Sequence, residues 1–314
     1  MKTLNEVYSS LSTRRRYEVW FLRFALAEGG GAWWIRYLLM NPGRNAYAAE
    51  SRLKPVQVWA TWFPEHDKPQ TYIQGFEIAG LELSDPGKNP LRMRIGENEI
   101  CQSSCKGALQ VDGHAISWNL EYRSTFRVTL SNKGWIGFSR TPHSNARFSG
   151  RIVLDGRVFE GNPVGFGVQG HNCGYRHRNL WTWAHAYFPG AEGSSTTLEA
   201  LVYDMPFGLL FRRAVLWHDG TRHQFRNFQQ IRRDSSPFQW GFHGTARDGL
   251  QMEAQFSGSL TSAHRLPYFK TDCSGSFDVL NNSLAQAVVQ LQRGGTALEK
   301  FQTSTGAVLE MAGG

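Results

Sequence analysis

Four Asp-Gly dipeptides divide this chain of 314 residues, and each lies between two runs rich in β-branched and aromatic residues. They are Asp112-Gly113, Asp155-Gly156, Asp219-Gly220 and Asp248-Gly249. The Asp-Gly pair favours the tight turn of a β-hairpin, because glycine accepts a positive φ without steric cost and aspartate tolerates one. Four such turns constrain the chain to antiparallel sheet. We therefore predict an all-β protein.

The composition supports this prediction. Aromatic residues make up 13% of the chain and charged residues 19%, whereas a helical bundle would contain more Lys, Glu and Ala. A helical turn is expected only within Met1–Ser12 and around Asn281–Ala287. The abundant glycines suit a fold in which strands are joined by many turns.

A faint internal repeat suggests how the strands are organised. Tyr17–Leu39 consists of an aromatic strand, a Gly-rich turn and a second strand, and Leu180–Tyr203 has the same layout. A chain of this length suits two domains. The prediction is two antiparallel β-barrels or sandwiches packed together, with domains at residues 1–155 and 156–314. Barrel closure would hide the sheet edges and leave cavities of ligand size. Chance similarity of two β-meanders is the alternative explanation of the repeat.

The charge and the cysteines limit the classes of partner and compartment. The formal net charge of +8 is dispersed in short Arg clusters between apolar strands, and no nucleic-acid-binding motif accompanies it. We expect no nucleic-acid partner; attraction to anionic substrates or membrane surfaces remains an alternative. The sequence contains no apolar run of signal-peptide or membrane-spanning length, and four cysteines do not make a secreted disulfide framework. These features predict a soluble, cytoplasmic protein without stable membrane insertion.

The densest cluster of polar and aromatic residues lies near the middle of the chain. Gly170–His177 is followed by Trp181–Phe188, and this second segment alternates like a β-strand. One face would carry Trp181, Trp183, His185 and Tyr187. Each of these rings has a polar atom that needs a partner when buried, so the face is poor filler for an apolar core. It suits the wall of a pocket for a large, mostly apolar molecule.

His171 and Asn172 precede this strand and are expected in a turn at a barrel mouth. His171 could transfer a proton near neutral pH while Asn172 orients the substrate or a water molecule. Both could equally tie the connection between the domains together through side-chain to backbone hydrogen bonds.

His185 is the second candidate for proton transfer, because the alternation places it beside Trp181 and Trp183. The indole faces could stabilise a cationic substrate or a carbocation-like transition state by cation–π attraction. The alternative is a structural histidine bonded to Tyr187 or to a backbone carbonyl.

Carboxylates inside predicted strands are the remaining candidates for acid catalysis, namely Glu18, Glu121 and Glu199. Desolvation in an apolar barrel would raise the pKa of such a group and suit it to general acid catalysis. Exposure to solvent, or an ion pair with Arg23, Arg36 or Arg123, is the ordinary alternative.

From these arguments the candidate catalytic residues are His171, His185 and Glu199. The candidate substrate-binding residues are Asn172, Trp181, Trp183, Tyr187, Trp20 and Tyr203.

No metal or cofactor is expected. His171, His177 and His185 lack HxH or HExxH spacing, and no second Cys or His pair answers Cys101 and Cys105. The GxSxG, GxGxxG and P-loop motifs are all absent, which argues against a serine nucleophile and against nucleotide cofactors.

Three features together resemble a known family. They are Tyr17-Glu18-Val19-Trp20 in the opening strand, His171-Asn172-x-Gly174 followed by Trp181-x-Trp183, and the closing Gly306-Ala307-Val308-Leu309-Glu310. The set resembles the two-domain lipocalin-like family of carotenoid hydratases, tocopherol cyclases, AttH-like proteins and fungal lipocalin-like Diels–Alderases. Gly170 and Cys173 depart from the family pattern, in which an acid and a Trp often stand at these places. The resemblance implies two calycin-like barrels with a pocket between or within them, and a bulky hydrophobic ligand.

The resulting functional hypothesis is a cofactor-independent enzyme acting on a bulky hydrophobic small molecule of polyketide or isoprenoid type. It would catalyse cyclisation, isomerisation or hydration by shape confinement and proton transfer. The alternative is a non-catalytic carrier with the same pocket.

Overall fold

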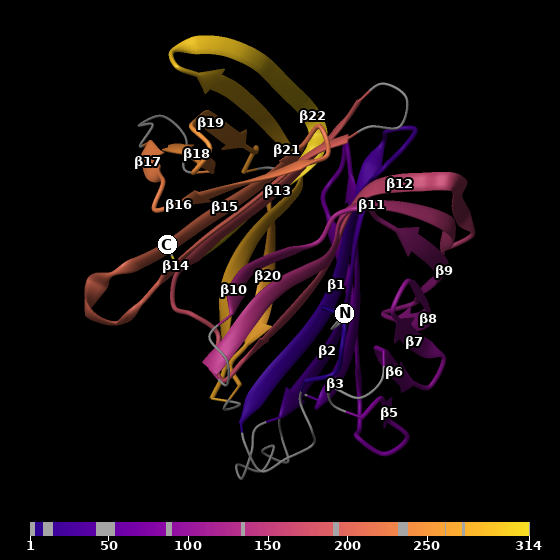
Figure 1. Ribbon diagram of the computed structural model, residues 1–314. Helices are drawn as coiled ribbons and strands as arrows, with labels where there is room; N and C mark the ends of the chain where they lie inside the picture. Colours follow the sequence, from indigo (N-terminus) through magenta and orange to yellow (C-terminus); the bar gives the residue numbers. More distant parts are fainter. Residues whose placement is uncertain are drawn as a thin grey trace.

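The computed structural model describes residues 4–8, 15–41, 54–85, 90–132, 136–190, 195–231, 238–260, 262–271 and 274–313. It confirms the all-β prediction: two curled antiparallel sheets pack against each other (Figure 1). The strands of the first sheet are β1 (Arg16–Leu26), β2 (Gly31–Asn41), β3 (Val56–Pro64), β4 (Gln70–Phe76), β5 (Glu82–Leu83), β6 (Arg92–Ile95), β7 (Asn98–Cys101), β8 (Ser104–Val111), β9 (His114–Arg123), β10 (Val128–Asn132), β11 (Gly137–Leu154) and β12 (Arg157–Gly174).

The strands of the second sheet are β13 (Trp181–Pro189), β14 (Ser195–Asp204), β15 (Leu210–His218), β16 (Thr221–Arg226), β17 (Gln229–Ile231), β18 (Gln239–Thr245), β19 (Leu250–Ser257), β20 (His264–Phe269), β21 (Ser276–Arg293) and β22 (Thr296–Ala312). A short 3-10 helix, Pro206–Gly208, joins β14 to β15. The helical turn expected around Asn281–Ala287 is wrong, because these residues continue the long strand β21. Met1–Ser12 lies largely outside the described residues.

The second sheet repeats the strand order of the first, except that β5 and β6 have no counterpart in it. The first runs β4-β3-β2-β1-β12-β11-β9-β8-β7-β6-β5 with β10 beside β11, and the second runs β16-β15-β14-β13-β22-β21-β19-β18-β17 with β20 beside β21. The hairpin β13–β14 therefore occupies in the second sheet the place of β1–β2 in the first. This shared topology supports a true structural repeat over a chance similarity of two meanders.

Three of the four Asp-Gly pairs form two-residue hairpin turns in which both residues have a positive φ. The values are 52° and 83° for Asp112 and Gly113, 50° and 82° for Asp155 and Gly156, and 46° and 69° for Asp219 and Gly220. Gly249, with φ at 81°, ends a longer connection between β18 and β19. The turn chemistry thus sets the register of three hairpins directly.

The passage from one sheet to the other comes later in the chain than the expected boundary between residues 155 and 156. Asp155-Gly156 is the hairpin turn between β11 and β12, and β12 pairs with β1 in the first sheet. The chain enters the second sheet only after Gly174, at Trp181. His171 and Asn172 thus belong to the first sheet and Trp181 to the second.

Buried apolar side chains of the described residues form three large clusters and a small fourth one of Val19, Leu38 and Met40. One core lies inside the curl of the first sheet and includes Trp20, and a second lies inside the curl of the second sheet and includes Ala184. A third core lies between the sheets, where Phe21 meets Trp183 edge to face at a centroid distance of 5.5 Å. The interiors of the curled sheets are packed with side chains, so space for a ligand arises between the sheets.

Arg23 of β1 binds the two sheets together. Its side chain is fully buried, and its guanidinium donates to the backbone carbonyls of Ser283, Thr305, Gly306 and Ala307 on β21 and β22. Pairing between these strands shifts register near Ala285, which breaks the regular ladder and leaves carbonyls for the arginine. Burial lowers the pKa of Arg23 to about 9, so the group still carries its charge at neutral pH.

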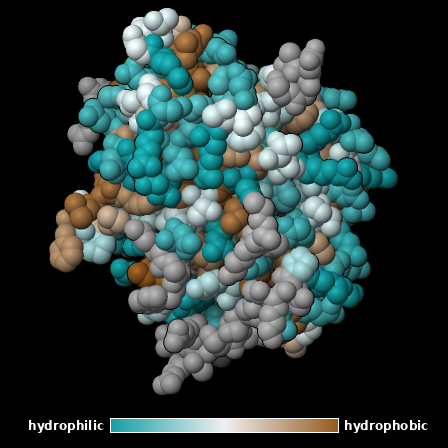
Figure 2. All heavy atoms as spheres, in the orientation of Figure 1, coloured by the Kyte–Doolittle hydropathy of each residue, from teal (hydrophilic) through white to brown (hydrophobic). Residues whose placement is uncertain are grey.

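The outer surface is ordinary for a globular protein. The face in Figure 2 is largely hydrophilic, with hydrophobic residues scattered over it. Among the described residues, no helix has both the length and the apolar composition needed to cross a membrane.

Replacing Arg23 by Met should destabilise the protein by roughly 2–4 kcal/mol, because four buried carbonyls lose a charged donor at once. Urea denaturation measures this change in the free energy of unfolding. Arg151→Met is the matched control, since Arg151 is exposed and its ion pair with Glu160 is long at 3.9 Å. Equal stability of the two variants would show that Arg23 does not hold the sheets together.

Candidate functional site

A cavity of about 740 Å³ lies between the two sheets. The first sheet contributes residues of β1, β2, β10, β11 and β12, and the second contributes residues of β13, β14, β20 and β22. Tyr175, Arg176, His177 and Arg178, from the connection between the sheets, complete the wall. Residues of the central cluster therefore do border a cavity, but most of the cavity wall comes from other parts of the chain.

Four of the predicted binding residues lie on this wall, namely Asn172, Trp181, Trp183 and Tyr203. The predicted alternation of β13 explains the position of the two tryptophans. Trp181 and Trp183 point towards the first sheet, while Ala184, Ala186 and Phe188 pack inside the second sheet. Asn172 reaches the cavity because it alternates with His171 along β12.

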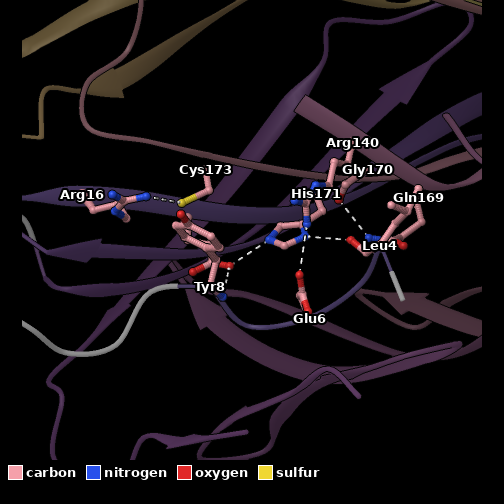
Figure 3. A network of polar contacts seen from close by, with 10 residues as sticks. Leu4, Glu6, Tyr8, Arg16, Arg140, Gln169, Gly170, His171 and Cys173 are labelled. Carbon is pink, nitrogen blue, oxygen red and sulfur yellow. Dashed lines mark hydrogen bonds and ion pairs between the residues drawn. The ribbon is translucent and has the colours of Figure 1, made fainter. Parts of the chain in front are cut away.

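His171 does not line the cavity and points into the polar network beneath it (Figure 3). The residue is fully buried, its Nε2 lies 2.8 Å from Glu18 Oε1, and its Nδ1 lies 3.2 Å from the carbonyl of Leu4. The imidazole stacks on the indole of Trp20, at a centroid distance of 5.0 Å, and Trp20 also lies away from the cavity. His171 thus links β12 to Glu18 on β1 and to the N-terminal segment at Leu4, and neither bond reaches the connection between the two sheets.

His185 is also enclosed by protein on all sides. Its Nε2–H donates to the carbonyl of Ser144 at 2.7 Å, and burial lowers its pKa to about 3, so the ring is neutral at physiological pH. Tyr187, the last ring on this face, stacks on Phe166 at 5.1 Å and contributes nothing to the cavity wall. The aromatic face of β13 thus reaches the cavity only with Trp181 and Trp183.

Glu199 lies one side chain behind the wall. Its carboxylate accepts hydrogen bonds from Thr141 Oγ1 at 2.7 Å, Trp183 Nε1 at 3.1 Å and Ser144 Oγ at 3.5 Å. Burial raises its pKa to about 7. Hydroxyl and indole donors therefore take the place of the arginine partner considered in the sequence analysis. Glu199 fixes the orientation of Trp183 without touching the cavity itself.

Glu310 is the acidic residue that the sequence arguments missed, and it does line the cavity. Its Oε1 accepts from Trp181 Nε1 at 2.9 Å, while its Oε2 accepts from Tyr268 at 3.1 Å and from Asn281 Nδ2 at 3.2 Å. Burial raises its pKa. In the sequence, Glu310 was notable only as the last residue of Gly306-Ala307-Val308-Leu309-Glu310, one of the three segments that resemble the family.

His177 and Tyr17 form a second polar edge of the cavity. Their rings stack at a centroid distance of 4.0 Å. Burial and the nearby Arg36 charge lower the pKa of His177 to about 3, and its Nδ1 has no partner among the described residues. His177 is therefore a neutral imidazole with a free polar atom. It lies in the wall segment that the sequence had already indicated.

The histidines of the central cluster do not gather into a metal site. His171, His177 and His185 belong to β12, to the connection and to β13. Within the described ranges, the one group of side chains able to hold a metal ion is His218, Asp219 and Glu299, and none of these residues borders the cavity.

The two departures from the family pattern, Gly170 and Cys173, both lie in tightly packed surroundings. A Cβ atom at Gly170 would lie 2.2 Å from the ring of Phe21. Cys173 is buried in the wall, and Arg16 Nη1 lies 3.6 Å from its sulfur. An acid before the histidine, as in the family pattern, would therefore require the Phe21 ring to move.

Glu199 makes stability depend on pH in a defined direction. A carboxyl whose folded pKa, about 7, exceeds its ordinary value of 4.5 stabilises the folded state while it is protonated. That contribution is complete below pH 4.5 and is lost as the pH rises through 7. Relative to Glu199→Gln, the wild type should lose roughly 3 kcal/mol across this window, measured by urea denaturation at several pH values. Glu121→Gln, on an exposed residue, is the control. The prediction is contradicted if the difference in unfolding free energy between wild type and variant is independent of pH for Glu199→Gln as well as for Glu121→Gln.

No protein-family model and no curated protein matches this sequence. Three solved structures have a similar fold. Kievitone hydratase from Nectria haematococca is 13% identical over 99% of this chain and 96% of that one, with a TM-score of 0.57. CghA with Sch210972 is 9% identical over 95% and 88%, with a TM-score of 0.63. An AttH-like protein from Nitrosomonas europaea is 12% identical over 96% and 93%, with a TM-score of 0.52.

These structures have the architecture that the sequence resemblance predicted, and at such low identities the similarity shows the fold alone. The chain therefore has the fold of the two-domain lipocalin-like family.

Proposed function

We propose that the protein is a cofactor-independent enzyme that converts a bulky hydrophobic small molecule by cyclisation, isomerisation or hydration in the cavity between its sheets. The observation that carries the proposal is a carboxyl group, Glu310, on the wall of a largely aromatic cavity. A purely structural protein has no need of such a group at a surface that a ligand can reach.

The size and lining of the cavity suit a small organic molecule. Its volume of about 740 Å³ falls within the range of ligand pockets, roughly 300–1,000 Å³. The walls combine large rings, such as those of Phe21 and Trp183, with a few polar groups at defined places. Such a cavity binds an apolar molecule by shape and holds it in one conformation, which lowers the entropic part of the barrier to cyclisation.

Glu310 is the group best placed for proton transfer. Burial raises its pKa, so the neutral acid persists to a higher pH than that of an exposed glutamate. Hydrogen bonds from Trp181, Tyr268 and Asn281 fix the direction of the carboxyl group. A held carboxyl with a raised pKa can donate a proton to the substrate and take one back in a later step. His177, neutral and unpaired at its Nδ1, is a second acceptor on the same wall.

This assignment changes the roles suggested by the sequence. Proton transfer moves from His171, His185 and Glu199 to Glu310, because the first three do not reach the cavity. Asn172 keeps its proposed role in orienting the substrate. The binding wall keeps Trp181, Trp183 and Tyr203, and Tyr187 and Trp20 are left out of it, as shown by the cavity lining.

The solved structures of similar fold support the proposal by analogy only. One of them is a hydratase by name, and the structure of another, CghA, includes the small molecule Sch210972. Both are consistent with a fold that holds small organic molecules.

The test uses a small-molecule extract of the source organism from a strain that lacks the gene. Adding pure protein should convert one compound into an isomer or into a product heavier by one water, as detected by untargeted mass spectrometry. Glu310→Gln keeps the shape of the side chain but cannot transfer the proton, so it should slow conversion by roughly 10²- to 10⁴-fold. Glu121→Gln, far from the cavity wall, should convert the compound at the wild-type rate.

Two results would contradict this assignment. Full activity of Glu310→Gln would place the proton transfer elsewhere. An unchanged extract, together with a compound that stays bound to the protein, would favour the carrier. In a carrier, Trp183→Ala should weaken retention of that compound while His185→Ala leaves it unchanged.

A further inference from the structure

Arg36 places a positive charge in the wall of the cavity. It lies on β2, its side chain is only 4% exposed, and it lines the cavity beside Trp34. The guanidinium lies over the rings of Trp34, Trp59 and Tyr268, at 5.1, 4.6 and 4.2 Å from their centroids. Three aromatic faces therefore hold this cation in one position.

Arg36 forms no salt bridge with a carboxylate in the part of the chain that the structure describes, and its Nη1 has no hydrogen-bond partner there. Buried charges in proteins are normally paired, because an unpaired charge in a low-dielectric interior is costly.

The acid on the same wall does not bond to Arg36. Glu310 is close enough for the Arg36 charge to lower its pKa, against the larger effect of burial, but its oxygens accept hydrogen bonds from Trp181, Tyr268 and Asn281. His177 is neutral, and Arg178, also on the wall, adds a further positive charge. The cavity wall thus carries three arginines, Arg36, Arg176 and Arg178, and one acidic residue, Glu310.

We propose that the ligand of this cavity carries an anionic oxygen group, such as a carboxylate, an enolate or a phenolate, and that this group pairs with Arg36. The inference rests on the cavity being the ligand site of the proposed function and names the chemical class of that ligand. A planar guanidinium held between rings offers fixed donors, which suits an oxygen anion better than a mobile ammonium group would.

The experiment compares two fluorescent probes that share the same rings. Anilinonaphthalene sulfonate carries an anionic group, and N-phenyl-naphthylamine lacks it. Each probe is titrated into the wild type, into Arg36→Met and into Arg157→Met. Arg157 is the matched control because it also lies over aromatic rings, those of Trp62 and Phe159, but outside the cavity wall.

In the wild type the anionic probe should bind more tightly than the neutral one. Arg36→Met should weaken binding of the anionic probe by roughly tenfold to a hundredfold and leave the neutral probe within about twofold, since only the charge-assisted contact is lost. Arg36→Lys should retain part of the preference. Arg157→Met should bind both probes like the wild type.

The neutral probe separates the possible failures. If Arg36→Met binds both probes as tightly as the wild type does, the anionic subsite is wrong while the cavity stands as a ligand site. If neither probe binds the wild type, the cavity is not a ligand site, and the proposed function fails together with this inference. If Arg36→Met loses both probes equally, Arg36 shapes the cavity without selecting an anion, and the inference is again overturned.

Discussion

A single face of β1 both joins the two sheets and forms part of the cavity between them. Tyr17, Val19 and Phe21 line the cavity, and Arg23, the next residue on that face, enters the second sheet and donates to its backbone carbonyls. Any shift of the packed sheets that moved Arg23 away from its four acceptors would leave a buried charge and buried carbonyls without partners, which costs more than the loss of an exposed hydrogen bond. The position of the cavity walls relative to each other therefore depends on Arg23. The buried hydrogen bonds of Arg23 therefore lie close to the apolar wall of the cavity because both belong to the same face of β1.

The shared strand order shows where the two halves of the repeat have diverged. Asn172 pairs with Val19 in the first sheet, and Glu310 pairs with Trp183 at the corresponding place in the second. Arg36 and Glu199 correspond in the same way on β2 and β14. At each pair of equivalent positions one residue is acidic and its counterpart is not. The chemistry of the site therefore arises from differences between two similar sheets that face each other across the cavity.

The hairpins and the alternation of β13 could be predicted from the sequence, because both are local. Asp-Gly turns require only the φ preferences of two residues, and alternation requires only the pleat of one strand. What each face meets depends on packing between strands far apart in the chain. His171 and Asn172 are neighbours, yet one points into the polar network and the other into the cavity. Arg36 and Glu310 are separated by most of the chain, so no sequence motif could reveal that both line the same cavity. The expected boundary at Asp155-Gly156 rested on a turn signal, which does not reveal which sheet continues after it; here the chain returns to the first sheet as β12.

The position of Arg36 changes the chemistry expected from an aromatic pocket. Indole and phenol faces suggested that the site would stabilise a cationic substrate or transition state. In the structure, the faces of Trp34, Trp59 and Tyr268 already hold the protein's own guanidinium. A second positive charge in the same cavity would be repelled, whereas negative charge developing on a substrate oxygen would be attracted. In the proposed function, Glu310 would then protonate carbon or oxygen as that charge collapses, which is the order of events expected for an enolate and opposite to that expected for a carbocation.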